Sequence, residues 1–251
     1  MTILHINKEK KFTEFFDKAD LAREIKFLVL HHIEAKSVDQ AVEMLKKHSV
    51  SAHFLVDESG KIYELVEENN IAYHAGVSYW KGYESLNNSS IGIEFINSSP
   101  FSKKFEEAQI ISGVVLCKYI AAKYKIEPRN IVGHSDIAYF KETGFLDRKQ
   151  DPSQFFDWKF FANNNVGVFP LNSSVQEEIV LFSIGDKSSK ILKIKENLAK
   201  FGYKVSSLND VFDDEMKFLT RVFNRRFNPR NFEFNSDVWY LSSQKVLEAL
   251  N

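Results

Sequence analysis

The segment Phe27-Leu28-Val29-Leu30-His31-His32-Ile33 is a compact apolar run that ends in two histidines. Such a run, short and rich in branched residues, is typical of a buried strand. Residues 52–57 and 61–66 have the same character and flank Glu58-Ser59-Gly60, which predicts a hairpin turn between two further strands.

Helical and strand patterns alternate on both sides of these runs. Ser37 precedes a short segment with apolar residues at helical spacing, and residues 106–125 carry a longer one. Residues 91–96 and 130–133 are two more strand candidates. This alternation, which continues to about residue 158, predicts an α/β domain with a mixed central β-sheet flanked by helices.

The pattern changes after Asn163-Asn164-Asn165, because three helical segments follow without a convincing strand. Ser188-Ser189, Asp213-Asp214 and Ser242-Ser243 are expected to cap their amino ends. We therefore predict an α/β domain over residues 1–171 and a small three-helix domain over residues 172–251.

Composition limits the classes of function. The chain has 251 residues, with 33 Lys+Arg against 34 Asp+Glu and a formal net charge of -1. This balance gives no field that would attract nucleic acid or an anionic membrane surface. No apolar run is long enough to span a membrane, and residues 1–11 contain no apolar core of the kind found in signal peptides.

All seven histidines lie at or before residue 134, so histidine chemistry belongs to the first domain. His31 ends one strand candidate, His134 follows another, and Asp151 lies a little further on. Two imidazoles and a carboxylate, with a fourth position open to water, form a hydrolytic zinc site. From the residues alone the alternative stays open that these are ordinary polar groups at strand ends.

Glu94 lies inside the apolar strand Ile91-Gly92-Ile93-Glu94-Phe95-Ile96. A carboxylate buried beside a metal-bound water would be suited to act as general base, whereas on an edge strand it would simply face solvent. Gly92 lies on the same face of the strand and is expected to leave room for a ligand. Residues 70–82 are rich in aromatic and small residues, which suits contacts to sugar or peptide, or else covers the core.

Six motifs in this order resemble the zinc-dependent N-acetylmuramoyl-L-alanine amidases of the type 2 family, especially the envelope branch with a helical domain similar to peptidoglycan-binding modules. They are Leu28-Val29-Leu30-His31, Val50-Ser51-Ala52-His53-Phe54-Leu55-Val56, Ala72-Tyr73-His74-Ala75-Gly76, Ser90-Ile91-Gly92-Ile93-Glu94, Val132-Gly133-His134-Ser135-Asp136-Ile137-Ala138 and Arg148-Lys149-Gln150-Asp151-Pro152. The resemblance implies cleavage of the amide between the lactyl group of N-acetylmuramic acid and L-alanine of the stem peptide.

The resemblance also implies roles for single residues. The metal ligands for Zn2+ would be His31, His134 and Asp151, while Glu94 and Lys149 would be catalytic. The candidates for substrate contact are His74, Trp80 and Asn97.

Two departures from the family pattern lie beside these motifs. Residues 140–147 are inserted ahead of Lys149, and Ser153 replaces a usual glycine. The insertion leaves Asp136 and Asp147 as rival acids for the ligand position of Asp151.

Two alternatives accompany this interpretation. Peptidoglycan-recognition proteins resemble the same fold, and some bind muropeptides without cutting them, but here every ligand position holds a competent residue. The expected partner is peptidoglycan or a muropeptide, with no nucleic acid and no obligate protein partner. The two-domain layout resembles periplasmic relatives, so we expect the periplasm or cell envelope, with the cytoplasm as the alternative.

Overall fold

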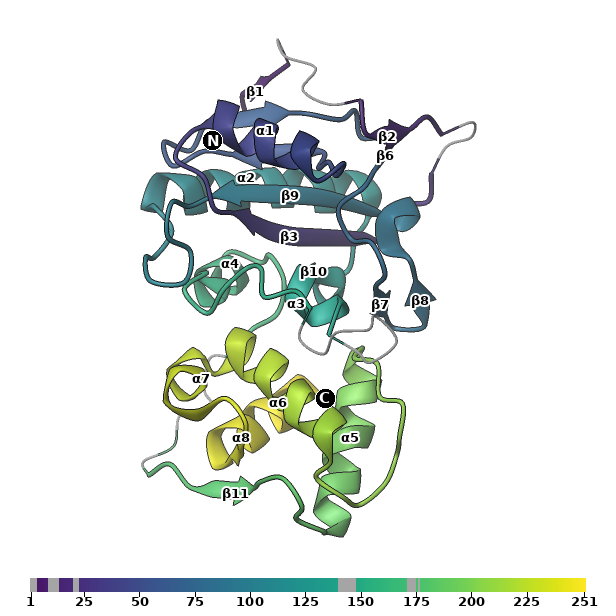
Figure 1. Ribbon diagram of the computed structural model, residues 1–251, viewed down its shortest axis with the longest axis vertical. Coiled ribbons are helices and arrows are strands. Elements are labelled where there is room, and N and C mark those ends of the chain that lie inside the picture. The colour runs from purple at the N-terminus through teal and green to yellow at the C-terminus, as the bar shows by residue number, and fades with distance from the viewer. Residues whose placement is uncertain (1–3, 9–13, 20–22, 140–147, 171–174, 176) are drawn as a thin grey trace.

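The computed structural model describes residues 4–8, 14–19, 23–139, 148–170, 175 and 177–251. It confirms a mixed sheet with helices on both faces, joined to a helical region (Figure 1). Within the described residues, no helix combines the length and the apolar character that crossing a membrane requires.

The central sheet has six strands in the order β1-β5-β4-β9-β3-β10. Only β4 and β5, the predicted hairpin, pair antiparallel, and every other neighbouring pair is parallel. The bounds are β1 Ile6–Asn7, β3 Phe27–Ile33, β4 Phe54–Val56, β5 Ile62–Glu64, β9 Ser90–Ile96 and β10 Ile131–Gly133. The parallel strands β3, β9 and β10 therefore bring their carboxyl ends to one edge, where open α/β sheets form their sites.

Two helices cover opposite faces of the sheet. The first, α1 (Val38–Lys47), begins where Ser37 accepts a hydrogen bond from the amide of Gln40, and packs on Ile33 and Leu55. The longer α2 (Glu107–Tyr124) covers the other face together with α4 (Trp158–Asn163). The site lies on the face that carries α1.

Short elements surround this sheet. Two-residue strands pair as β2 (Phe16–Asp17) with β6 (Ile71–Ala72) and as β7 (Tyr79–Trp80) with β8 (Tyr83–Glu84). Single turns of helix are η1 (Leu86–Ser89), η2 (Pro128–Asn130) and α3 (His134–Ile137).

The carboxyl-terminal region contains more elements than the sequence predicted. The described part of this region, residues 175 and 177–251, contains four helices, α5 (Ser189–Phe201), α6 (Asp214–Phe227), α7 (Pro229–Asn235) and α8 (Leu241–Leu250). Strands β11 (Val180–Phe182) and β12 (Trp239–Tyr240) pair antiparallel, so the expectation of three helices without a strand was wrong. Ser188 and Asp213 cap as predicted, whereas Ser242 and Ser243 lie inside α8.

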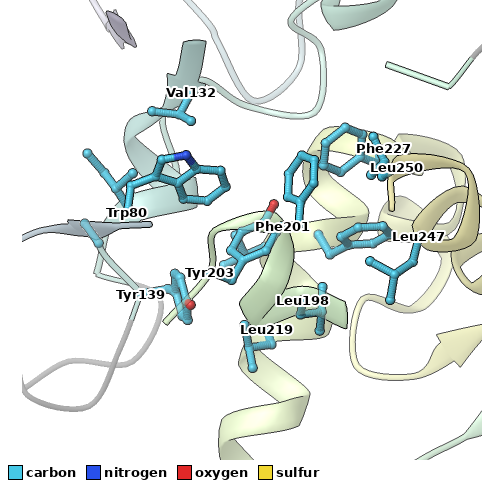
Figure 2. Packing of buried hydrophobic residues seen from close by; sticks show 14 of the residues in the cluster. Trp80, Val132, Tyr139, Leu198, Phe201, Tyr203, Leu219, Phe227, Leu247 and Leu250 are labelled. Atoms are coloured by element: carbon cyan, nitrogen blue, oxygen red, sulfur yellow. The ribbon is translucent and has the colours of Figure 1, made fainter. Parts of the chain in front are cut away.

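The helical region and the sheet share one hydrophobic core. Phe27 and Val29 of β3 belong to the same buried cluster as Leu198, Leu219 and residues of α8. Figure 2 shows Trp80 and Val132 on one side and Phe201 and Tyr203 facing them from the helical side. The predicted boundary near residue 172 therefore separates two segments of the chain that share a hydrophobic core.

Candidate metal centre

Three donor atoms converge at the carboxyl ends of β3 and β10. His31 lies in β3, His134 is the first residue after β10, and Asp151 reaches the same point from the later loop. The Nδ1 atoms of the two histidines are 3.1 Å apart, and Oδ2 of Asp151 lies 2.9 Å from one and 3.0 Å from the other.

Hydrogen bonds fix which nitrogen of His134 carries its proton. Its Nε2 lies 3.1 Å from the carbonyl oxygen of Ala75, which can only accept. Nε2 therefore carries the hydrogen of the neutral ring, and Nδ1 presents a lone pair to the centre.

A longer chain of hydrogen bonds fixes His31 in the same way. Ser90 donates its hydroxyl to the carbonyl of Leu86 and so accepts from Nε2 of His74. Nδ1 of His74 is then free to accept from Nε2 of His31, at 3.1 Å. His31 consequently also directs a lone pair from Nδ1 at the centre, in the second-shell pattern typical of metal-bound histidines.

This arrangement fits a metal ion. The lone pairs of two imidazoles and a carboxylate point at one another without a hydrogen-bond donor. These acceptor atoms repel one another, and a bound cation would offset that repulsion. Tetrahedral zinc with bonds of about 2.0–2.1 Å would separate its ligand atoms by about 3.3 Å, within a few tenths of an ångström of the distances found.

The protonation states suit metal binding too. Burial lowers the pKa of His31 to about 4, so its ring is neutral at pH 7. Neutral imidazoles and an ionised carboxylate are the forms that bind metal.

Gly92 does not leave room for a ligand, contrary to the expectation from sequence. A Cβ at this position would lie 2.4 Å from Cγ of His74, whose ring fills the space over the strand. The main-chain amide of Gly92 also donates to Nδ1 of His53, whose ring stands at 74° to that of His74. Gly92 thus admits an imidazole of the protein itself.

Glu94 lies beside the centre. It is the register partner of His31 in the neighbouring parallel strand, so the two side chains extend from the same face. The residue is 8% exposed, and its Oε2 is buried without a hydrogen-bond partner. Burial, with a smaller contribution from the charge of Asp151, raises the pKa of Glu94 well above its usual value.

Lys149 is partly exposed and lies close enough to influence both sides of the site. Its positive charge opposes the upward shift in the pKa of Glu94, and it contributes to the low pKa of His31.

Two of the predicted substrate contacts lie elsewhere. Trp80 is 0% exposed, donates its Nε1 hydrogen to the carbonyl of Arg129 and packs on Phe201 and Tyr203, so it is a core residue. Asn97 is 1% exposed and holds the following loop through its bonds to Ser99 and Lys103. The prediction that these two contact substrate is not supported, because their side chains are already occupied within the protein.

The rival acids can be separated in part. Asp136 is buried and bonds to the amide of Gly133 and to Tyr203 and Arg226, so it is not a ligand. Asp147, with the rest of the insertion at residues 140–147, lies outside the described residues. The roles of Ser90 and of the Ala75 carbonyl were not predictable, since neither a buried hydroxyl nor a backbone oxygen produces a recognisable sequence pattern.

The two histidines and the aspartate provide the donor set of a metal-dependent hydrolase. The buried glutamate beside them is placed to act as a general base. Residues 21–154 match the family model for N-acetylmuramoyl-L-alanine amidase. The chain belongs to this enzyme family.

The similarity extends past the catalytic part. The amidase AmiD of Escherichia coli (strain K12) is 32% identical over 244 residues, which cover 90% of this chain and 82% of the relative. The structure of E. coli AmiD in complex with the substrate anhydro-N-acetylmuramic acid-L-Ala-D-gamma-Glu-L-Lys superposes with a TM-score of 0.74 at 30% identity, covering 92% of this chain and 90% of the other.

Two further relatives show where the likeness reaches. AmpDh3 of Pseudomonas aeruginosa, at 26% identity and a TM-score of 0.72, covers 92% of this chain and 93% of its own. The 1,6-anhydro-N-acetylmuramyl-L-alanine amidase AmpD of Haemophilus influenzae is 32% identical over 169 residues, 59% of this chain and 87% of the relative. AmiD and AmpDh3 therefore match the helical region as well as the sheet.

Proposed function

We propose that this protein is a zinc-dependent amidase that hydrolyses the bond between N-acetylmuramic acid and L-alanine in muropeptides or peptidoglycan. The observation that carries the metal is the convergence of three ligand atoms, His31 Nδ1, His134 Nδ1 and Asp151 Oδ2, which lie 2.9–3.1 Å from one another. The substrate class comes from the similarity to AmiD, whose complex holds an anhydro-muropeptide.

His31, His134 and Asp151 would hold the zinc, which when bound supplies a Lewis acid that acidifies water and polarises a carbonyl. Glu94 takes the proton from the attacking water and later returns it to the nitrogen of L-alanine, because an amide anion is a very poor leaving group. Its raised pKa suits a group that both accepts and gives a proton near neutral pH.

Lys149 has a separate task in this proposal. Its ammonium group stabilises the negative charge that develops on the lactyl oxygen during attack, a role worth about 3–4 kcal/mol for a well-aimed donor. His74 accepts a hydrogen bond from Nε2 of His31, which makes it a positioning residue for the metal.

The non-catalytic alternative requires a defective ligand set. A recognition protein that only binds muropeptides needs neither three converging donors nor a buried glutamate with a raised pKa. The complete set supports hydrolysis over mere binding.

The helical part, residues 172–251 in the predicted division, is proposed to contact the wall polymer. It carries a cavity of about 840 Å³ whose rim includes Phe234, 86% exposed, together with Asn231 and Tyr240. An exposed ring beside amide groups suits sugar rings, so Phe234→Ser should weaken sedimentation with sacculi while turnover of small muropeptides persists. Action on wall substrates favours the cell envelope as the location, which fractionation of cells would test.

The metal proposal is tested by removal and return of the ion. Treatment with a chelator should abolish hydrolysis of an anhydro-muropeptide, and about one equivalent of zinc should restore it. Turnover that continues without any bound metal would contradict the proposal.

A further inference from the structure

A single turn of helix, α3, positions two of the three metal ligands. His134 is its first residue, and the amide of Ser135 donates to the main-chain carbonyl of Asp151 at 2.7 Å. The turn is closed by Asp136, whose Oδ2 accepts from the amide of Gly133 at 2.8 Å. The direction of His134 and the placement of Asp151 therefore both depend on where Asp136 is held.

Asp136 is held by the helical region. Arg226 of α6 donates from Nη1 to Oδ2 at 2.5 Å, and the hydroxyl of Tyr203, just after α5, donates to Oδ1 at 3.0 Å. The side chains of Arg226 and Asp136 are each 1% exposed, so water cannot substitute for either partner.

Arg226 is itself fixed to the sheet side. Its Nη2 donates to the carbonyl of Ile131 in β10 at 3.1 Å, and its guanidinium lies 4.2 Å from the centre of the Trp158 ring. The planar guanidinium thus connects the strand that precedes His134 with the carboxylate that closes the turn after it.

We infer that Arg226 and Tyr203, two residues of the helical region, are positioning residues for the metal centre. They act through Asp136, which sets α3 and with it His134 and Asp151. The helical region is then part of the catalytic apparatus in addition to any role at the wall. This inference rests on the metal site of the proposed function.

The chain offers a matched pair of variants to test this. Tyr203→Phe removes the hydroxyl bound to Asp136 and keeps the ring in the shared core. Tyr139→Phe removes another buried hydroxyl at the same interface, one that donates to the carbonyl of Lys204. Both lose one buried hydrogen bond, so similar losses of thermal stability are expected.

Metal affinity separates the two variants. The affinity of the folded full chain for Zn2+, measured by competition with a chelating dye, should fall about 3–10-fold in Tyr203→Phe and stay at the original value in Tyr139→Phe. The visible spectrum of the Co2+-loaded protein should change in Tyr203→Phe only, because it reports ligand geometry.

Arg226→Lys provides an independent arm, with Arg221→Lys in the same helix as its control, since Arg221 pairs with Asp237. A lysine keeps the charge but cannot bond Asp136 and Ile131 together, so zinc affinity should fall in Arg226→Lys alone. Equal affinities and spectra in folded variants and controls would overturn the inference. If the original chain itself bound no metal, the proposed function would fail and not this inference alone.

Discussion

At the scale of single residues, Glu94 is set apart from the ligands by its unpartnered oxygen and raised pKa. Glu94→Gln keeps the volume of the side chain but removes its ability to take a proton. We expect the variant to retain its zinc and lose about 10²-fold or more in turnover. Metal content and turnover measured on the same preparation check this, and near-original turnover would reduce Glu94 to a structural residue.

Buried histidines make the metal-free protein sensitive to acid. Burial lowers the pKa of His32 to about 4 and that of His53 to about 3, whereas in the unfolded chain both titrate near their ordinary value of about 6.5. Below that value the two histidines are protonated in the unfolded chain but remain neutral in the folded chain. The free energy of unfolding therefore falls as pH decreases from about 6.5 to about 4.

Melting curves of the chelated protein between pH 7.5 and pH 4.5, on the order of one curve each half unit, measure this loss. The same curves for His48→Gln, a change at an exposed position after α1, serve as the control. A midpoint that does not change across this range would show that these histidines are not held neutral.

At the scale of elements, β9 carries His74 against its surface. Gly92→Ala would drive a methyl group into the His74 ring, which costs about 1–3 kcal/mol of stability and removes the support of His31. We expect zinc affinity to fall about 10-fold. Gly113→Ala is the control, because it crowds Phe95 on the opposite face and should destabilise without changing the affinity.

Trp80 belongs to the interface between β7 and the helical region. Trp80→Phe should lower stability by about 1–3 kcal/mol, because the smaller ring leaves a gap against Phe201 and Tyr203. The KM for a muropeptide should stay constant in this variant. A raised KM with unchanged stability would restore Trp80 as a substrate contact.

The long elements were predictable because their patterns are strong. The run that became β3 matches its predicted bounds, and β9 and α2 differ from prediction by a residue at their ends. Strands of two residues such as β7 and β12 carry too few positions to show alternation. Their pairing follows from the surrounding packing, which the local sequence does not encode.

The ligand residues of the candidate site were predictable from the sequence, whereas the residues that orient them were not. His31, His134, Asp151 and Glu94 come together because the topology brings three parallel strand ends to one edge. The Trp80 and Asn97 interpretations failed for one reason, since an aromatic or amide side chain in a loop looks the same in sequence whether it faces a groove or the core.

At the scale of the whole molecule, the shared core bears on the separability of the helical part. A chain that ends at residue 171 would expose Trp80, which now packs against Phe201 and Tyr203, and would lose the part of the shared hydrophobic cluster that α5, α6 and α8 contribute. We expect such a chain to aggregate or to melt well below the full chain. A soluble fragment that keeps its melting temperature and its turnover would show instead that the helices are an independent module.

The seam near residue 172 illustrates what sequence can and cannot show. The change from alternating to helical patterns was visible, but a buried contact such as Arg226 with Asp136 joins residues far apart in the chain. No local sequence pattern around Arg226 or Asp136 predicts that the two residues contact each other. The dependence of the site on the helical region is therefore visible only in the fold.

The central claim is that water, activated at the metal centre, cleaves the lactyl amide. Mass spectrometry of a purified anhydro-muropeptide, incubated with the zinc-loaded protein in water enriched in heavy oxygen, tests it most directly. We predict an anhydro-N-acetylmuramic acid that carries the heavy oxygen in its lactyl carboxyl group and a peptide with a free amino group on L-alanine. An intact substrate, or label only in a fragment cut within the peptide, would contradict the account.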